Sequence, residues 1–593
     1  MKKPQKIYMK KFLIPLFAVL VILLVVGFKA SKDKQQKKIK ITTAYLLFPV
    51  EENADEVKTT INYPDKKLPD IFWIRLAQNK VDYWVKLEIG KYKGKNLELI
   101  FDGPSAAKFG IKRIKPSDHF KVNYPEPYRP DFHFSPEYGW MNDPNGLTYL
   151  ESEYHLFYQY NPFGTKWGNM SWGHAVSTDL TSWTYLPVAL WPDTLGAIFS
   201  GSVVIDKNNT AGFGRNAMIA IYTSSGKVQS QCLAYSTDKG RTFTKFEKNP
   251  IIPNPGITDF RDPKVSWYQP ENKWIMALAT KQTVTFYSSL DLKNWNRESE
   301  FGEGIGSHAG VWECPDLFPL TYEGKTKWVL LVSINPGGPN GGSATQYFVG
   351  DFDGEKFQAD PLPYPLWIDY GRDNYAGVTF SNISENDGRR IFLGWMNNWD
   401  YANETPTKIF RSCNTIPREL QLINNGNHCI LSSYPVKEVD LLRERTVDFP
   451  AQIVENENTL NELLKDNDGS FELRMILQPE KGNVFGFTLQ NLKGEKLDFV
   501  FDLFTQSINI QRNKSGLIGF NDRFPLGMNA PLLPKKSYEI RLLIDKCSAE
   551  LFINHGEIVM TSLFYPNEVM NTLKFFSKEG TLKVENIKVG DVK

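Results

Sequence analysis

The chain has 593 residues, too many for one hydrophobic core, so several domains are expected. Its 69 Lys and Arg residues nearly balance its 67 Asp and Glu residues, and the resulting net charge of +2 gives no basis for binding nucleic acid or a strongly acidic partner. The five cysteines are scattered without metal-ligand spacing, which argues against a disulfide framework, and we expect most of them to be buried thiols.

A mostly apolar run from Phe12 to Phe28 predicts that the chain is exported. Lysines flank the run on both sides, and its 17 residues lie between the length of a signal-peptide core and that of a spanning helix. Positive charge ahead of the run orients the N-terminus toward the cytoplasm. Residues 1–40 are therefore predicted to be a signal peptide, or a membrane anchor through residues 12–28, followed by a linker. The rest of the chain is then periplasmic, extracellular or held outside the cytoplasm.

Residues 41–125 alternate apolar and polar side chains over short stretches such as 83–89 and 97–101. A period of two is typical of half-buried strands, so this region is predicted to be a small N-terminal β domain. Its composition indicates no chemistry. The proline-rich stretch 124–130 predicts a stiff joint to the next domain.

Two internal repeats organise residues 126–437. Residues 177–183 recur loosely at 236–243, 289–295 and 350–357, and each copy predicts a hairpin turn. The other repeat introduces an apolar strand at intervals of roughly 50 to 65 residues, at Asp143-Pro144, Ser200-Gly201, Asp262-Pro263, Glu313-Cys314-Pro315 and Tyr375-Ala376-Gly377. Five units with room for about four strands each predict a five-bladed β-propeller.

Residues 438–593 show longer alternating strands separated by regular turns, which predicts a C-terminal β-sandwich of two packed sheets. The whole chain is thus predicted to be all-β. In a propeller the first strand of each blade lines the central axis. Asp143, Asp262 and Glu313 stand at three of the five blade starts, so we expect these carboxyl groups to meet in one pocket.

The neighbours of these carboxyl groups predict two different protonation states. Asparagine amides flank Asp143, and Arg261 adjoins Asp262, so both aspartates are expected to be ionised with low pKa values. Glu313 has no cationic neighbour in the sequence, and an apolar setting near two anions would raise its pKa. A nucleophilic carboxylate and a protonated acid together suit glycoside cleavage with retention, whereas inversion requires a wider separation, which the sequence leaves open.

Three motifs in this order, Asn142-Asp143-Pro144-Asn145-Gly146, Arg261-Asp262-Pro263 and Glu313-Cys314-Pro315, closely resemble glycoside hydrolase family 32. This is the invertase, inulinase and levanase family, which has a five-bladed propeller followed by a β-sandwich. Residues 157–162, 167–174, 199–202 and 550–557 are similar to it as well. The resemblance covers about residues 130–593 and leaves out the first 130.

The resemblance implies a role for each matching residue. Asp143 would attack the anomeric carbon C2 of a β-linked fructosyl unit, Glu313 would protonate the leaving oxygen and then activate water, and Asp262 would stabilise the transition state. The implied substrate-binding residues are Asn142, Gln159, Trp167, Ser200, Arg261, Asp373 and Trp395. The chain departs from the family at Asp373-Asn374-Tyr375-Ala376, where members often carry Asp-Phe-Tyr-Ala. His174 is interpreted as a core histidine.

The sequence therefore predicts an exported, retaining β-fructosidase that acts on levan, inulin or fructo-oligosaccharides. We expect exo cleavage with release of fructose and no metal or cofactor. A fructosyltransferase, a non-catalytic fructan-binding or sensing protein, and an inverting arabinan-type hydrolase are the alternatives. The linkage cleaved, the role of residues 41–125 and the oligomeric state stay open.

Overall fold

The computed structural model describes residues 32–593 apart from residues 65–68, 123, 385, 462 and 465. The predicted signal peptide or anchor, including residues 12–28, lies outside the described residues. Within the part of the chain that is described, no helix is long and apolar enough to span a membrane. Strands dominate, which confirms the predicted all-β class. The helical elements described are α1 (Lys108–Arg113) and the short 3-10 turns η1 (Gly90–Tyr92), η2 (Ser105–Ala107), η3 (Gln269–Glu271) and η4 (Lys437–Leu442).

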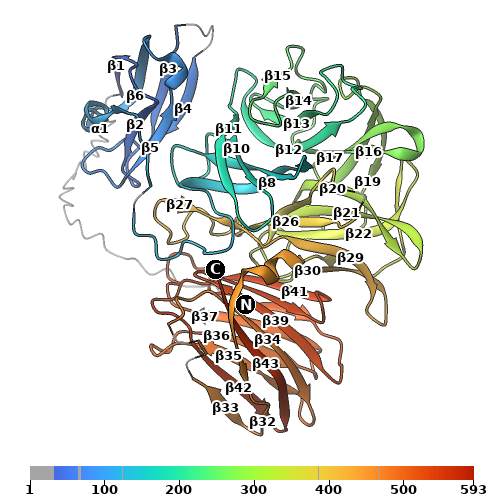
Figure 1. Cartoon of the computed structure of the whole chain (residues 1–593). Coiled ribbons are helices and arrows are strands. Elements are labelled where there is room, and N and C mark those ends of the chain that lie inside the picture. Colours follow the sequence, from blue (N-terminus) through green and yellow to red (C-terminus); the bar gives the residue numbers. More distant parts are fainter. Residues whose placement is uncertain (1–31, 65–68, 123, 385, 462, 465) are drawn as a thin grey trace, which may run out of the picture.

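Two sheets form the N-terminal β domain, blue in Figure 1. One has the order β1 (Lys32–Lys40), β6 (Asn96–Pro104), β3 (Val57–Asn62), β4 (Asp70–Ile74), and the other β5 (Tyr83–Glu88), β2 (Tyr45–Val50), β7 (Lys115–Ser117). Buried and exposed residues alternate along β3 and β6, as the period of two predicts.

Residues 32–40, predicted to be part of a linker, instead form β1, which pairs with β6 along its whole length. The sequence KDKQQKKIK is too polar to indicate a strand. It is stable as one because β1 lies at the edge of its sheet, where lysine side chains can stay in water.

Five four-stranded antiparallel sheets follow in chain order, the first, fourth and fifth each with one extra short strand. The first contains β8 (Gly139–Leu150), β9 (Glu153–Asn161), β10 (Ser171–Ser177), β11 (Thr184–Leu190) and β27 (Phe410–Arg411). The second contains β12 (Ala197–Asp206), β13 (Ala217–Ser225), β14 (Gln229–Ser236) and β15 (Thr244–Lys245). The third contains β16 (Phe260–Tyr268), β17 (Lys273–Thr280), β18 (Thr283–Ser289) and β19 (Asn296–Phe301). The fourth contains β20 (Val311–Tyr322), β21 (Lys325–Asn335), β22 (Ala344–Phe352), β23 (Phe357–Ala359) and β24 (Leu366–Trp367). The fifth contains β25 (Tyr375–Thr379), β26 (Ile391–Met396), β28 (Cys413–Asn414), β29 (Arg418–Asn424) and β30 (Cys429–Pro435).

The first strands of these sheets form a closed ring. β8 contacts β12, β12 contacts β16, β16 contacts β20, β20 contacts β25, and β25 returns to β8 (Figure 1). The ring is closed further by β27, which lies between β26 and β28 in the chain and pairs in parallel with β8, so that the fifth unit is joined to the first. This arrangement is the predicted five-bladed propeller.

The short repeat that begins at Ser177 forms the turn between the third and fourth strands of a blade. Asp179 accepts hydrogen bonds from the backbone N–H groups of Thr181 (2.8 Å) and Ser182 (2.7 Å). Asp291 does the same for Lys293 and Asn294 in the third blade. An aspartate that binds backbone amides two and three residues ahead stabilises a tight turn, so the predicted hairpin turns are confirmed here.

Two further sheets form the C-terminal sandwich, orange to red in Figure 1. One contains β31 (Arg443–Phe449), β43 (Leu582–Val592), β34 (Phe471–Pro479), β39 (Tyr538–Asp545), β40 (Ser548–Ile553), β41 (Ile558–Leu563) and β32 (Gln452–Val454). The other contains β33 (Glu457–Leu460), β42 (Thr572–Lys578), β35 (Val484–Gln490), β36 (Lys496–Asp502), β37 (Ser507–Lys514) and β38 (Met528–Pro531). Their core includes Phe485, Phe487, Phe499 and Phe501, which are all fully or nearly fully buried.

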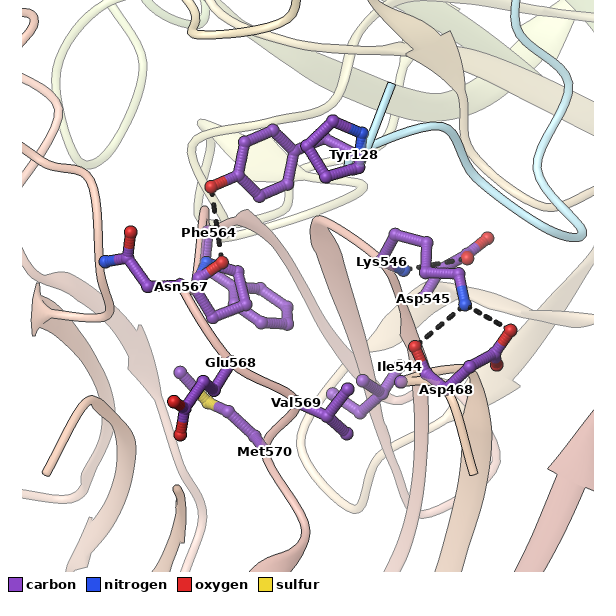
Figure 2. A pocket seen from close by; sticks show the side chains of 13 residues that line it. Tyr128, Asp468, Ile544, Asp545, Lys546, Phe564, Asn567, Glu568, Val569 and Met570 are labelled. Carbon is purple, nitrogen blue, oxygen red and sulfur yellow. Dashed lines mark hydrogen bonds and ion pairs between the residues drawn. The ribbon is translucent and has the colours of Figure 1, made fainter. Parts of the chain in front are cut away.

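The segment that leads into the propeller lies against the sandwich. Figure 2 shows Tyr128 above a cavity of about 190 Å³, where its hydroxyl donates a hydrogen bond to the carbonyl of Pro566 (3.2 Å). Lys546 lies at the other side of this cavity and pairs with Asp468 (2.7 Å) and with Asp131 (3.0 Å). Tyr128 in the predicted joint and Asp131 directly after it therefore both fix this segment to the sandwich.

The cysteines and His174 behave as expected. All five cysteines are free thiols, and four are buried, with Cys429 partly exposed. His174 lies in β10, is 1% exposed and stacks on Phe157 with ring centroids 4.0 Å apart. It is a core histidine.

Candidate active site

The inner strand of every blade carries a β-bulge near its start. The register with the second strand shifts between Met141 and Pro144 in β8, Ile198 and Gly201 in β12, Arg261 and Lys264 in β16, Glu313 and Asp316 in β20, and Tyr375 and Val378 in β25. A bulge leaves residues unpaired and changes the direction of their side chains. Proline tolerates such a position because its missing N–H is not needed there. The repeated Asp-Pro and Cys-Pro pairs are therefore the sequence signal of these bulges.

The bulges align the five blades residue by residue. The aligned pairs are Asn142-Asp143, Phe199-Ser200, Arg261-Asp262, Glu313-Cys314 and Tyr375-Ala376, each followed by Pro or Gly. Asp262 (φ 64°), Cys314 (φ 45°) and Ala376 (φ 53°) share the left-handed backbone conformation. Glu313 thus corresponds to Arg261, and the position equivalent to the two aspartates is Cys314. The prediction that the three carboxyl groups share one position of the repeat is wrong by one residue.

Asp143 lies half-buried in the bulge of β8 with donors on both carboxylate oxygens. Oδ2 accepts hydrogen bonds from the Ser200 hydroxyl (2.7 Å) and from the Cys314 thiol (3.5 Å). Oδ1 accepts one from Nδ2 of Asn142 (2.9 Å), whose own Oδ1 is held by the Trp140 indole (2.7 Å). These contacts fix the orientation of the carboxylate.

Asp262 is 6% exposed and lies next to the same thiol. Its Oδ2 accepts hydrogen bonds from the backbone N–H of Cys314 (3.1 Å) and from its Sγ (3.6 Å). Its own N–H donates to the Thr223 hydroxyl (3.0 Å), which ties the bulge of β16 to the second blade. One thiol from β20 therefore separates the two aspartates, each within hydrogen-bond reach of it.

Glu313 does not lie in the apolar surroundings that the sequence suggested. The guanidinium of Arg261 donates to its Oε1 through two nitrogens, at 2.9 and 3.1 Å, and the Tyr375 hydroxyl donates to its Oε2. Arg261 also pairs with Asp259 (2.5 Å) and lies 4.0 Å from Asp262. The predicted cation beside Asp262 thus contacts Glu313 more closely, so the predicted apolar environment of Glu313 is wrong.

The pKa values of the two aspartates shift in the direction opposite to the prediction. Burial raises the pKa of Asp143, and the hydrogen bonds from Ser200 and Asn142 oppose that shift without reversing it. Burial also raises the pKa of Asp262 to about 7; Arg261 lowers it, while Glu313 and Asp143 raise it further. The two aspartates, close together in one buried space, thus hold protons more tightly than they would in water.

These groups line a cavity of about 250 Å³ at the axis of the propeller. The predicted binding residues Asn142, Gln159, Trp167, Ser200 and Arg261 all line it, together with the three carboxylic residues. Gln159 is 2% exposed, and its Nε2 has no hydrogen-bond partner among the described residues. Nor does the described part of the chain contain a group of three or more His, Cys, Asp or Glu side chains that could hold a metal ion.

Asp373 is placed elsewhere. It is fully buried, its Oδ2 pairs with Arg512 of the sandwich (2.5 Å) and accepts the backbone N–H of Leu563 (2.8 Å), and its Oδ1 accepts the Tyr401 hydroxyl (2.6 Å). Both carboxylate oxygens of Asp373 thus already have partners, and the residue does not line the cavity. The predicted substrate-binding role of Asp373 therefore does not fit its surroundings. It joins the propeller to the sandwich.

Trp395 is also fully buried and does not line the cavity. Its ring packs 4.9 Å from that of Trp399, which does line the cavity, and 6.0 Å from that of Trp140. Trp395 therefore supports the cavity wall from behind, and the predicted direct contact with substrate does not fit this position.

Several residues of the site were not predicted as site residues. Phe199, Asn335 and Trp399 line the cavity, Cys314 contacts two carboxylates, and Tyr375 contacts the third. For Phe199, Cys314 and Tyr375 a signal existed, since each occupies one of the aligned bulge positions. Asn335 is the last residue of β21 and Trp399 follows β26, and no repeat marks either of them.

The loop between β9 and β10 carries Trp167 and is held by the N-terminal domain. Phe163 stacks on Phe72 with ring centroids 3.7 Å apart, and the Thr165 hydroxyl donates to Glu52 (2.7 Å). Asn169 exchanges two hydrogen bonds with the backbone of Trp73, at 2.8 and 2.9 Å. The N-terminal domain thus reaches the cavity through the loop that presents Trp167.

Comparison with family models covers nearly the whole described chain. The model "Glycosyl hydrolases family 32 N-terminal domain" matches residues 133–435, and "Glycosyl hydrolases family 32 C terminal" matches residues 438–591. Residues 31–132 match a domain of unknown function, DUF4980.

Individual proteins give the same result. The levanase of Bacillus subtilis is 44% identical over 482 residues, which are 79% of this chain and 71% of that one. The extracellular exo-inulinase of Aspergillus ficuum is 39% identical over 502 residues, 75% of this chain and 91% of that one. Among solved structures, the exo-inulinase of Aspergillus awamori superposes with a TM-score of 0.73 at 34% identity, over 80% of this chain and 99% of that one. The fructofuranosidase of Schwanniomyces occidentalis complexed with fructose gives 0.71 at 32% identity, over 80% and 100%.

Proposed function

The chain belongs to glycoside hydrolase family 32, and on that premise we propose how its central cavity cleaves fructans. It is a glycoside hydrolase of the β-fructosidase class. Its relatives are named for the hydrolysis of levan and inulin, which does not favour a fructosyltransferase or a non-catalytic binding protein.

One observation carries the assignment of the catalytic residues. Carboxyl groups from three different blades border one small cavity, and the Cys314 thiol lies within 3.6 Å of the two aspartates. Glu313 immediately precedes Cys314, the residue that carries this thiol, in the chain. Two carboxyl groups that flank one glycosidic bond are the minimum that retaining hydrolysis needs, and the third can stabilise charge on the sugar ring.

In the first step Asp143 is the nucleophile. One of its oxygens forms a bond to C2 of the terminal fructosyl unit while the bond from C2 to the leaving oxygen breaks, and Glu313 transfers its proton to that oxygen. The donors Ser200 and Asn142 keep the Asp143 carboxylate aimed at the cavity, so little reorganisation is needed at the moment of attack.

In the second step water attacks C2 of the fructosyl-enzyme. Glu313, now ionised, takes a proton from that water, and the bond from C2 to the Asp143 oxygen breaks, which releases fructose and restores both residues. Arg261 and Tyr375 hold the two oxygens of Glu313, and this fixes the direction in which it donates and accepts the proton.

The remaining lining residues bind the sugar. Asp262 faces the cavity between Arg261 and Cys314, where its negative charge would stabilise the positive charge that develops at C2 in the transition state. The unpartnered Nε2 of Gln159 supplies a donor for a fructose hydroxyl, because a buried amide without a partner is costly. Trp167, 46% exposed, offers a ring face at the cavity.

The size of the cavity supports exo cleavage. At about 250 Å³ it is below the usual range of roughly 300–1,000 Å³ for ligand sites, which suits one terminal sugar unit better than the middle of a chain. Relatives named levanase and exo-inulinase both occur, so we propose fructans as the substrate class and test the two linkages side by side.

The location follows from the same relatives. Proteins named extracellular exo-inulinase support export of this chain. We propose that residues 12–28 direct this export and are either removed or kept as an anchor.

The test is the loss of turnover in two variants. Asp143→Asn and Glu313→Gln should each lower kcat by about 10³-fold or more, whereas Glu303→Gln, at an exposed glutamate outside the cavity, should not. Turnover near that of the parent in either of the first two variants would refute the assignment. Chromatography of products from levan, inulin and sucrose tests the mode: fructose alone from the start indicates exo cleavage, and a series of oligomers indicates endo cleavage.

A further inference from the structure

A second and larger cavity lies between the N-terminal domain and the propeller. Its volume is about 650 Å³, against about 250 Å³ for the catalytic cavity, and it falls within the range typical of ligand sites. β4 and η1 form one wall, and β11 with the connections that follow β11 and β14 forms the other. Cavities between domains are common places for ligands.

The lining of this second cavity combines ring faces with polar groups. Tyr92, half-buried, packs at a tilt against Tyr63 with ring centroids 4.5 Å apart, and Trp191 and Phe243 line the cavity from the propeller. Ile71 on β4 is 42% exposed and adds a further apolar surface. Flat apolar faces with polar groups beside them are suited to sugar rings, which are apolar on one face and carry hydroxyl groups at the edge.

The charges of the lining favour a neutral ligand. Two acidic side chains, Asp70 and Glu88, face two basic ones, Lys91 and Arg241, so the cavity has little net charge. Arg241 is already paired with Glu153 at 2.7 Å. A phosphate or a polyanion would require unpaired cations, whereas a polyol needs only donors and acceptors.

One loop connects the two cavities. Trp167 lines the catalytic cavity, and Asn169, two residues later, lines the second one. Asn169 is fixed there by its two hydrogen bonds to the backbone of Trp73. A polymer with its end in the catalytic cavity thus has a second binding surface on the other side of the Trp167 loop.

We propose that the second cavity binds a segment of the fructan chain, of roughly two to three sugar units by the ratio of the two volumes. The N-terminal domain then supplies half of a polymer-binding site and holds the substrate near the catalytic cavity. This inference rests on the proposed function only for the identity of the polymer.

The test measures polymer binding separately from catalysis. The full chain carrying Glu313→Gln is run in gels that contain levan, inulin or dextran, and its affinity for each is taken from the retardation. Adding Tyr92→Ala or Arg241→Ala, one from each wall, should weaken fructan affinity about fivefold, the value expected for the loss of one ring or polar contact. Phe504→Ala, at a ring 83% exposed on the sandwich, is the matched control and should change nothing.

Kinetics of the active enzyme give a second readout. The ratio of kcat/KM on levan to that on sucrose should fall about fivefold in Tyr92→Ala and Arg241→Ala. Arg241 is exposed, so its variant decides the result if Tyr92→Ala lowers the melting temperature. Unchanged fructan affinity in Arg241→Ala, or equal retardation by dextran, would overturn the proposal. Absence of fructose release by the parent chain would instead refute the catalytic assignment and leave the binding result valid.

Discussion

The propeller meets its two neighbouring domains in different ways. At the sandwich, charged groups far apart in the sequence pair in the dry interior: His133 lies between Asp545 and Glu550 at 2.7 Å each, and Arg418 contacts both Glu550 and Asp369. At the N-terminal domain the contacts are mainly apolar: Tyr138, Phe163 and Ile409 of the propeller lie in the domain's core. Hydrogen bonds such as that from Thr165 to Glu52 add to this packing, and a large cavity remains beside it.

The contrast indicates different tasks. Removing one member of a buried ion network leaves the others charged and desolvated, which costs several kcal/mol, so the sandwich junction resists any displacement. Apolar packing with few hydrogen bonds can shift at lower cost, because no charged group is left buried without a partner. The sandwich therefore acts on the stability of the propeller, and the N-terminal domain acts on the position of Trp167 and on the space around it.

The strongest test of this contrast removes the central cation of the sandwich junction. Arg418 is fully buried, so Arg418→Met should lower the free energy of unfolding by about 3–5 kcal/mol, because Glu550 and Asp369 lose their partner. Arg523→Met is the matched control, since Arg523 also bridges to the propeller, through Asp400, but is 64% exposed; it should cost less than about 1 kcal/mol. Urea denaturation measures both, and equal losses would contradict the contrast.

The same junction should make stability depend on pH. Burial alone would lower the pKa of His133, but the hydrogen bonds and charges of Asp545 and Glu550 outweigh it and raise the pKa to about 9. A raised pKa means that the stability from protonated His133 is complete below the unfolded pKa of about 6.5 and is lost as the pH rises through about 9, on the order of 3 kcal/mol in all. Denaturation at pH 6.5 and at pH 9.5 should show this loss in the parent.

His133→Gln provides the control, because glutamine cannot carry the charge. Its stability should be lower at pH 6.5 and should change much less between the two pH values. A parent and a variant with parallel pH profiles would show that His133 does not titrate in this window.

The sequence predicted the ring of blades and most of the cavity because both rest on local signals that repeat. Each inner strand has a bulge near its start, and a following Pro or Gly marks it in all five blades. Predictions made from neighbouring residues were wrong where the partners of a side chain lie on other strands. Arg261 adjoins Asp262 in the chain, yet its guanidinium turns to Glu313 in the next blade, 52 residues away.

Distance in the chain explains the other misjudged residues. Asp373 stands just before a blade start and was assigned to the sugar, but its partner Arg512 lies 139 residues further on, in another domain. The sequence of β1 is too polar to predict a strand, and these residues form one by pairing with β6. The contacts between the N-terminal domain and the loop that carries Trp167 give no signal in the composition or in the residue spacing.

The prediction with the smallest expected effect tests whether the N-terminal domain positions the loop that carries Trp167. Thr165→Val removes one hydroxyl that donates to Glu52 at the N-terminal junction. The variant should raise KM on sucrose about threefold, because Trp167 is then held less firmly. It should change kcat less than about twofold, because the catalytic carboxyl groups are untouched. Thr488→Val removes a comparable hydroxyl in the sandwich, where it donates to Asp498 at 2.6 Å. Both variants should lose about 1 kcal/mol of stability, and only the first should change KM. An equal KM in the two variants would mean that the N-terminal domain does not position the loop, and the contrast between the two junctions would then be one of stability alone.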